Sequence, residues 1–258
     1  MWRPSRWWRQ ASALPWSAVR RGRWEESPAV QDDFSLSLSS VSLSRGSREL
    51  FRDFSFRAEE KKVSCIMAPS GSGKTTLLSW LAQRLCGQGR SVSFLFQEPR
   101  LIPTASVLQN VLLPLSTLMP PDKAAARARD FLRRVQLEQK AQSLPGELSG
   151  GELRRAAVAR SFAYPARILL MDEPFQSQDL RIKLELCGIL RELLREEPRT
   201  VLCVSHDIRE AVEISDRISI MDGSPLTVKA DIRDVQAKPR REVEARIESI
   251  LCARGAQN

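Results

Sequence analysis

Short apolar segments alternate with longer amphipathic segments along most of this chain. Segments 63–67, 91–96, 168–171, 201–204 and 218–221 have the length of buried strands. Strands of a parallel sheet are almost continuously apolar, because helices cover both faces of the sheet. Apolar residues at helical spacing predict helices at 75–86, 105–115, 122–137, 152–164, 180–194, 208–214 and 240–253. The pattern predicts an α/β fold with a doubly wound, mostly parallel core sheet.

Ahead of the first apolar strand the pattern changes to alternation. From Phe34 to Leu43 apolar residues largely alternate with serine, with a one-residue slip that predicts a β-bulge. Phe54 and Phe56 alternate again beyond the turn at 45–47. We expect these two strands to form an N-terminal antiparallel β lobe.

The chain is expected to have three parts: a basic, Trp-rich extension at 1–30, a globular domain at 31–235 and a helical tail at 236–258. The extension lacks the apolar core of a secretory signal, which makes secretion an unfavoured interpretation. We expect it to be disordered. Binding at a membrane interface is the alternative, because tryptophan and arginine are both favoured there.

Composition narrows the possible functions. The net charge is +9, but much of the excess lies in the N-terminal extension, so no nucleic-acid partner is expected. The five scattered cysteines lack metal-ligand spacing and are typical of reduced thiols. No segment approaches the roughly 20 apolar residues of a membrane-spanning helix. Any role at a membrane would therefore depend on a partner or a surface contact.

The segment after the first apolar strand has the features of a phosphate-binding loop. Gly71 and Gly73 leave room for backbone N–H groups to surround an anion at the start of the next helix. Lys74 is placed to reach the β- and γ-phosphates, and the Thr75 hydroxyl to bind Mg²⁺. Ala68 replaces the first glycine of the pattern, which is acceptable if that position does not need a positive φ. The expected ATP-binding residues here are Ala68, Pro69, Ser70, Gly71, Ser72, Gly73, Lys74, Thr75 and Thr76.

Two carboxylates, Asp172 and Glu173, directly follow the apolar strand at 168–171. Ligands of open α/β sheets bind at the carboxyl ends of the strands. Acids at the end of a strand are common, but these follow a phosphate-binding loop in the same predicted sheet. We therefore expect Asp172 to hold Mg²⁺ through water and Glu173 to act as general base.

A second glycine turn opens the helix predicted at 152–164. Its residues are Leu148, Ser149, Gly150, Gly151 and Glu152. Such a turn is often merely flexible, but it can also direct a helix N-terminus at a phosphate. Two such helix starts in one chain would allow ATP to be closed between two copies.

His206 is the only histidine of the chain, and it follows the apolar strand at 201–204. A single histidine is commonly structural. This one is predicted at the same sheet edge as Asp172 and the phosphate-binding loop. An imidazole there can donate to a γ-phosphate oxygen or orient water.

Taken in order, these motifs resemble those of the ATP-binding subunits of ABC transporters, over about residues 34–230. Ala68–Thr75 resembles the Walker A motif, Leu148–Glu152 the signature motif and Ile168–Glu173 the Walker B motif. Gln97, Asp179 and His206 correspond to the Q-loop, D-loop and H-loop residues. The resemblance implies a P-loop ATPase with an α-helical signature subdomain, which binds ATP and Mg²⁺. It also implies that Glu173, His206 and Gln97 are catalytic and that Thr75, Gln97 and Asp172 hold the metal.

Within that family, segments 96–103, 172–175 and 205–211 most resemble the nitrate/sulfonate/taurine importer group. The resemblance implies a separate integral-membrane permease and a second ATP-binding cassette, with a homodimer expected. It further implies an extracytoplasmic solute-binding protein in the same system. The chain itself would then sit peripherally on the cytoplasmic face of the cell membrane. The loop at 98–103, bracketed by Pro99 and Pro103, is expected to expose Leu101 and Ile102 to the permease.

Four departures from the family pattern stand beside the resemblance. Ala68 replaces a glycine, and segment 176–179 keeps only Asp179 of the usual D-loop. The stretch from Lys74 to Gln97 is short for the family, which suggests that part of the antiparallel lobe is missing. The position that usually stacks on adenine holds Ser44 or Arg45 instead of an aromatic residue. We expect the Arg45 guanidinium to stack on the base.

Two other classes of function remain as alternatives. A soluble ABC ATPase without a permease would be expected to carry two cassettes or a long coiled-coil insertion, and neither is seen in this sequence. A nucleotide-binding pseudo-enzyme subunit would fit the departures. The residues that argue against it are all present: Lys74, Thr75, Gln97, Asp172, Glu173 and His206.

Overall fold

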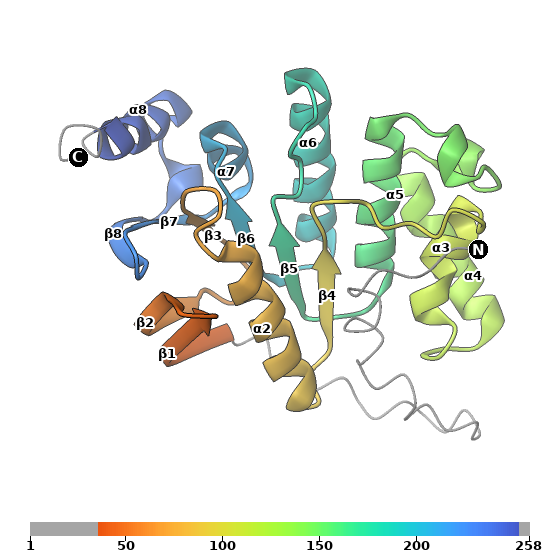
Figure 1. Cartoon of the computed structure of the whole chain (residues 1–258). Coiled ribbons are helices and arrows are strands. Elements are labelled where there is room, and N and C mark those ends of the chain that lie inside the picture. Colours follow the sequence, from red (N-terminus) through yellow and green to blue (C-terminus); the bar gives the residue numbers. More distant parts are fainter. Residues whose placement is uncertain (1–35, 253–258) are drawn as a thin grey trace.

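A six-stranded sheet forms the centre of the computed structural model, which describes residues 36–252 (Figure 1). Its strands are β3 (Val63–Met67), β4 (Val92–Leu95), β5 (Ile168–Asp172), β6 (Thr200–Ser205), β7 (Arg217–Asp222) and β8 (Thr227–Ile232). They pair in the order β4-β5-β6-β3-β7-β8, parallel throughout except for the antiparallel pair β7–β8. The predicted α/β fold with a mostly parallel sheet is confirmed.

The antiparallel lobe consists of β1 (Leu36–Arg45) and β2 (Arg48–Ala58). A register shift between Leu38 and Val41 confirms the predicted bulge. Only Gln88–Ser91 lie between helix α2 (Lys74–Gly87) and β4, so this short segment adds no strand to the lobe. The predicted extension at 1–30 and the start of the first strand at Phe34 lie outside the described residues.

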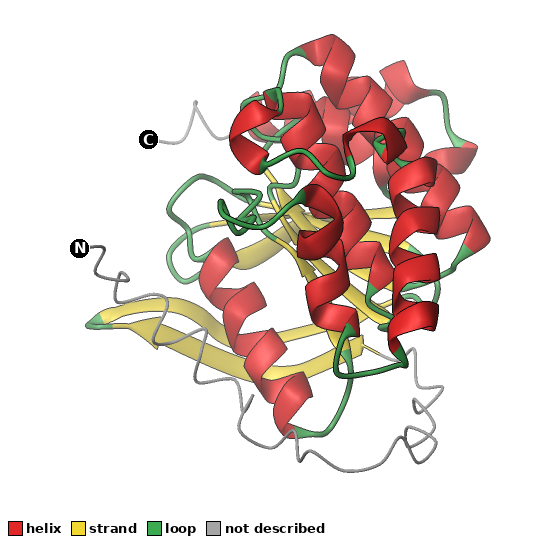
Figure 2. Cartoon of the chain, turned by 90° about the vertical axis from the view of Figure 1, so that its right-hand side faces the viewer, coloured by secondary structure: helices red, strands yellow, loops and turns green. Residues whose placement is uncertain are grey.

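Alternating side chains of the sheet strands build two separate cores. In β3, Cys65 and Met67 face one core, whereas Ile66 faces the other. The first core packs against helices α3 to α8, and the second against α2 and the β1–β2 lobe. Figure 2 shows helices on both sides of the edge-on sheet. The carboxyl ends of the parallel strands are therefore the part of the sheet that remains open to a ligand.

The remaining helices match the predicted segments, with shifted ends. They are α3 (Val107–Leu112), α4 (Pro121–Arg134), α5 (Gly150–Ala163), α6 (Leu180–Glu196), α7 (Ile208–Ile214) and α8 (Arg240–Cys252), with 3₁₀ turns η2 (Leu113–Leu115), η3 (Glu138–Lys140), η4 (Pro145–Glu147) and η5 (Val235–Ala237). The helix predicted from 105 begins later because Ser106 caps it together with Gln109. The helix predicted to reach 137 ends at Arg134, since Gln136 has a positive φ of 60°.

Helices α3, α4 and α5 pack on one another beside β4 and form the predicted helical subdomain, at the right of Figure 1. Helix α8, in the predicted tail, buries Val243 and Ile247 in the first core and contacts α7. Among residues 36–252, no helix has both the length and the apolar character needed to cross a membrane.

Candidate active site

The phosphate-binding loop connects the buried strand β3 to α2. Gly71 and Gly73 have φ values of 71° and 104°, in the region that glycine adopts most easily. A Cβ on Gly73 would also lie 2.9 Å from Cδ1 of Leu50, on β2. Ala68 is buried and has no positive φ, so an alanine in place of the first glycine is compatible with the backbone at this position.

Lys74 points back into this loop. Its Nζ donates to the carbonyl oxygens of Ala68 and Pro69 at 2.9 and 3.0 Å, and lies 3.2 Å from Oε1 of Glu173. The Oγ of Ser72 is buried and has no hydrogen-bond partner. A phosphate oxygen would satisfy that hydroxyl, which is an observation in favour of an anion in the loop.

Thr75, at the start of α2, meets Asp172, the last residue of β5. The Thr75 hydroxyl donates to Oδ1 of Asp172 at 3.1 Å. Burial raises the pKa of Asp172, and the Glu173 charge adds to this, while the Thr75 hydrogen bond opposes it. No cluster of three or more His, Cys, Asp or Glu side chains suited to a metal occurs within residues 36–252. One hydroxyl and one carboxylate do suit Mg²⁺, which commonly takes few protein ligands and completes its shell with phosphates and water.

Glu173 lies between the phosphate-binding loop and His206. Its φ is 44°, a strained backbone conformation for a residue other than glycine, and its N–H donates to the Val204 carbonyl at 2.9 Å. Oε2 of Glu173 lies 2.9 Å from Nδ1 of His206. The structure thus brings together Lys74, Glu173 and His206, from three separate motifs, at one sheet edge.

Gln97 extends from the end of β4, and its side chain is exposed. Its amide donates to the side chain of Gln176, in the predicted D-loop. Among the described residues no direct bond joins Gln97 to Thr75 or Asp172, so its proposed place at the metal would need a change in side-chain position. Asp179 caps α6 by accepting from the Ile182 N–H at 3.0 Å.

The signature turn is built as a helix start. The Ser149 hydroxyl accepts from the Glu152 N–H at 3.3 Å, and the Glu152 carboxylate accepts from the Ser149 N–H at 2.8 Å. A Cβ on Gly151 would lie 3.2 Å from Cγ2 of Ile182, so this turn packs closely on α6. In Figure 1, β4 and β5 lie between α2 and α5. This separation favours a nucleotide contact with a second copy over one within the chain.

Arg45 ends β1 and is exposed, at a position paired with Arg48 across the turn. Arg48, which belongs to none of the predicted motifs, donates from Nη1 to the Gly71 carbonyl at 3.4 Å. The sequence does place Arg48 three residues after Arg45, beyond the turn at Gly46, and this spacing could have indicated that the two arginines lie side by side. Both cations therefore belong to the lobe that faces the phosphate-binding loop.

The loop after Gln97 is held from two sides. Arg160 donates to the Pro99 and Arg100 carbonyls at 2.7 Å each, and the Asn110 side chain bonds both the N–H and the carbonyl of Ile102. The prediction that Leu101 and Ile102 are exposed was wrong, because both are half-buried and Leu101 packs on the first core. The loop is nevertheless fixed in position, as the two prolines predict.

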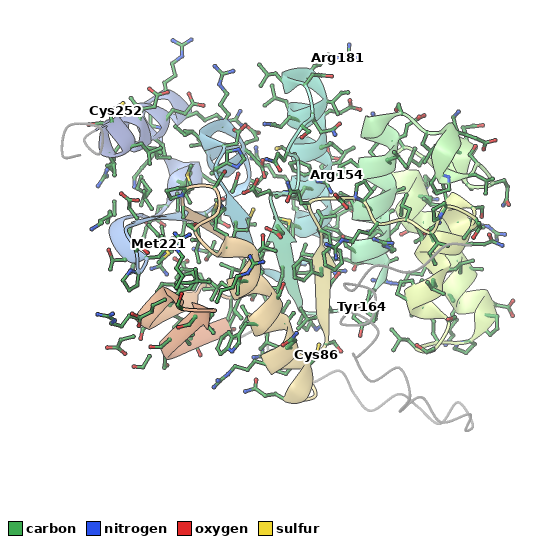
Figure 3. All side chains as sticks on the ribbon, viewed as in Figure 1. Cys86, Arg154, Tyr164, Arg181, Met221 and Cys252 are labelled. Carbon is green, nitrogen blue, oxygen red and sulfur yellow. The ribbon has the colours of Figure 1, made fainter. Side chains whose placement is uncertain are left out.

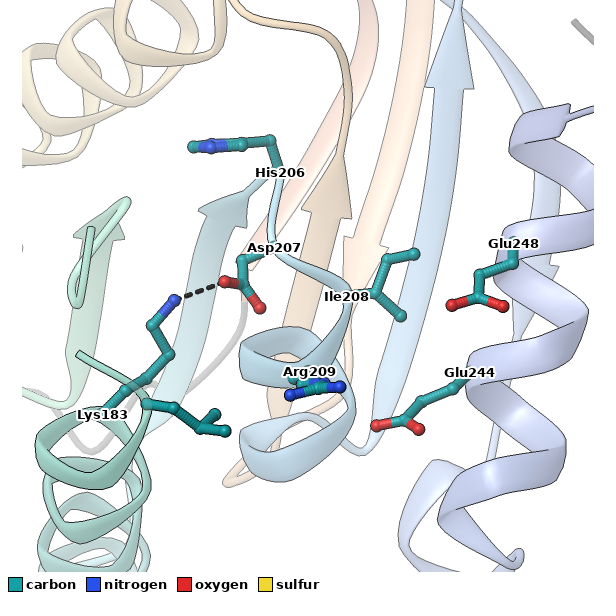
Figure 4. A pocket seen from close by; sticks show the side chains of 8 residues that line it. Lys183, His206, Asp207, Ile208, Arg209, Glu244 and Glu248 are labelled. Carbon is teal, nitrogen blue, oxygen red and sulfur yellow. Dashed lines mark hydrogen bonds and ion pairs between the residues drawn. The ribbon is translucent and has the colours of Figure 1, made fainter. Parts of the chain in front are cut away.

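An open cavity of about 550 Å³ lies beside His206 (Figure 4). It is bounded by the starts of α6 and α7 and by two carboxylates of α8, Glu244 and Glu248. Lys183 of α6 pairs with Asp207, which also caps α7. Burial alone would raise the pKa of Asp207, but the Glu210 N–H and Lys183 outweigh it and lower that pKa. The cavity leaves the His206 side of the site accessible.

Comparison with known proteins identifies the family to which this chain belongs. Residues 51–176 match the ABC transporter family model. An aliphatic sulfonates import ATP-binding protein of Xanthomonas axonopodis pv. citri is 36% identical over 76% of this chain and 84% of that protein. The sulfate/thiosulfate import ATP-binding protein of Escherichia coli is 34% identical over 72% of this chain and 57% of that protein. The dimeric structure of a bacterial ABC transporter cassette has a TM-score of 0.66, with 27% identity over 76% of this chain and 97% of that one.

A second solved structure of that cassette, a dimer in a post-hydrolysis state bound to ADP and Pi, has a TM-score of 0.65. The fold and the ordered motifs define a P-loop ATPase. This chain belongs to the ATP-binding proteins of ABC transporters, and relatives at 35%, 36% and 37% identity are named as import ATP-binding proteins. It is an ATPase whose function is ATP-powered solute import through a separate permease.

Proposed function

We propose that this subunit works with Mg²⁺, which the Thr75 hydroxyl and the Asp172 carboxylate would hold together with Gln97 and the nucleotide's phosphates. The backbone of Ala68–Thr76 and the Lys74 ammonium would bind the phosphates. Glu173 would then accept a proton from the attacking water, and His206 would orient that water or donate to the γ-phosphate. When bound there, Mg²⁺ would neutralise part of the negative charge that develops on the phosphoryl group.

The observation that carries this proposal is the Lys74–Glu173–His206 cluster. A lysine that binds phosphate and an acid that activates water must act on the same phosphoryl group, so they must lie within a few ångströms of each other. Here Nζ of Lys74 lies 3.2 Å from Oε1 of Glu173, and Nδ1 of His206 lies 2.9 Å from its Oε2. Such a cluster favours hydrolysis over simple nucleotide binding and disfavours the pseudo-enzyme alternative.

We further propose that two copies close on ATP, with Leu148–Glu152 of one facing the phosphate-binding loop of the other. The Asp179 segment would lie at the same interface. The permease would hold the pair at the cytoplasmic face of the membrane, and an extracytoplasmic solute-binding protein would deliver the solute. In this assignment residues 31–235 are the ATP-binding domain, and 236–258 form a tail anchored by α8. The relatives' names cover sulfonates, sulfate and spermidine, so the ATPase subunit alone does not define the solute.

The test is co-purification of the full chain from membranes, followed by ATP hydrolysis with and without Mg²⁺. A polytopic membrane protein should come down with the chain, and hydrolysis should require Mg²⁺. Recovery of the chain only in the soluble fraction, with active Mg²⁺-dependent hydrolysis, would instead favour the soluble ABC ATPase. A complex that binds ATP without hydrolysing it would favour the pseudo-enzyme.

A further inference from the structure

Arg154, in the second turn of α5, is the feature that the motifs leave unexplained. Its side chain is buried, with 2% exposure, in the middle of the molecule (Figure 3). It lies four residues before the buried Val158, on the same face of the helix. A buried arginine needs several acceptors for its five N–H donors, so its partners indicate its role.

Those partners are backbone carbonyls of the catalytic segments. Nη1 of Arg154 donates to the Phe96 carbonyl at 2.6 Å, and Nη2 donates to the Gln97 carbonyl. Nη2 also lies 3.5 Å from the Glu173 carbonyl, at the limit of a hydrogen bond. One planar guanidinium therefore contacts the end of β4, the Q-loop and the residue that follows β5.

The charge on Arg154 is retained at neutral pH. Burial lowers its pKa to about 10, and the Glu210 carboxylate acts in the opposite direction. No carboxylate among the described residues forms an ion pair with it, unlike the neighbouring Arg155, which pairs with Glu185 at 2.7 Å. A cation that donates to backbone carbonyls can hold the backbone in position, because hydrogen bonds from a charged donor are stronger than those between neutral groups.

Arg154 and the signature turn belong to one rigid helix. Ser149 caps α5, and Arg154 follows within its first two turns. A displacement of the signature turn therefore moves the guanidinium, and with it the carbonyls of Gln97 and Glu173. The strained φ of Glu173, 44°, makes its carboxylate sensitive to such a shift.

We propose that Arg154 is a positioning residue that couples the signature turn to Gln97 and Glu173 of the same chain. When α5 engages the nucleotide held by a second copy, Arg154 sets the catalytic pair of its own site. Coupling through α5 would supplement the D-loop, which here keeps only Asp179 of its usual residues. The proposal rests on the proposed two-copy ATPase and assigns to it a route of communication between the sites.

The experiment compares Arg154→Met with Arg155→Met in the full complex with the permease. Both changes remove one guanidinium from the same helix, but Arg155 contacts α6 and not the catalytic segments. For Arg154→Met we expect kcat to fall by about 10- to 100-fold, while the KM for ATP changes less than about threefold. For Arg155→Met we expect kcat within about twofold of the parent, since its ion pair is partly exposed.

Two further variants separate positioning from folding. Arg154→Lys keeps the charge but loses the planar fork, so it should fold with an unfolding midpoint near that of the parent and still have a low kcat. In a Glu173→Gln background, Arg154→Met should leave ATP-dependent dimerisation intact. Full activity of Arg154→Lys, or loss of the dimer with unchanged kcat, would overturn the proposal. A parent complex that hydrolyses no ATP would instead refute the proposed function on which it rests.

Discussion

Nδ1 of His206 lies 2.9 Å from Oε2 of Glu173. This contact joins the residue that follows β6 to the residue that follows β5. On its other side Glu173 contacts Lys74, so one carboxylate bridges the phosphate-binding lysine and the histidine. Its two neighbours hold the Glu173 side chain at the edge of the phosphate-binding loop. This arrangement makes Glu173 the central residue of the proposed mechanism.

Changing Glu173 to Gln should separate binding from hydrolysis. The amide keeps the size of the side chain but cannot accept a proton, so hydrolysis should fall by roughly 10²-fold or more while the affinity for Mg-ATP is preserved. The ATP-bound closed state should then accumulate. Size-exclusion chromatography with ATP should show a dimer.

Lys74→Ala is the control, because it should lose nucleotide binding and remain monomeric. A Glu173→Gln protein that hydrolyses ATP at the parent rate would remove Glu173 from the mechanism. Monomeric behaviour with bound ATP would indicate that the second cassette is a different chain.

Arg45→Ala should weaken ATP binding about fivefold if its guanidinium stacks on adenine, an interaction of about 1 kcal/mol at an exposed site. Arg48→Ala is the comparison, because Arg48 contacts the Gly71 carbonyl and should affect ATP and GTP equally. Titration of each variant with ATP, ADP and GTP distinguishes the two. Unchanged affinities in Arg45→Ala would assign the base to another residue.

Ile102→Asp should release the subunit from the permease while ATP binding by the isolated subunit is preserved. Ile102 is half-buried and its backbone is held by Asn110, so a change confined to its side chain should leave the loop in place. Val228→Asp is a matched control, since Val228 is 47% exposed on β8, away from the helical subdomain. Retention of the complex by Ile102→Asp, with normal transport, would reject the loop as the permease contact.

Glu210 should make stability fall as pH rises. Burial raises its pKa to about 8, and Asp207 adds to this effect, whereas Lys183 and Arg154 oppose it. The folded state therefore holds a proton that the unfolded state releases above about pH 4.3. The stability that this proton contributes is fully present below the pKa of Glu210 in the unfolded state, and it is lost as pH rises through about 8.

Denaturant unfolding between pH 5 and 9 measures this effect. Because of Glu210, the free energy of unfolding should fall with pH at a slope that approaches about 1.4 kcal/mol per pH unit. Glu210→Gln should remove this dependence, because the amide does not titrate. The variant should be more stable than the parent at the alkaline end. An identical pH dependence in both proteins would show that Glu210 is ionised in the folded state.

The sequence by itself determined the order of the elements and named most of the candidate site residues. Strands such as Ile168–Asp172 are apolar because both faces are buried, and the glycines of the phosphate-binding loop mark positive φ. Both are local properties, which a sequence displays directly. The predicted bulge near Leu38 and the cap at Ser149 are of the same local kind.

Only the tertiary structure decided which distant residues meet. The contacts Thr75–Asp172 and Glu173–His206 depend on the strand order β5-β6-β3, which parallel crossovers set and no local pattern encodes. The same holds for Arg154, a charged residue that sequence alone would place on a solvated face of α5. Its guanidinium meets three carbonyls from the segments that follow β4 and β5, and these carbonyls converge only once the sheet and the helix have packed together.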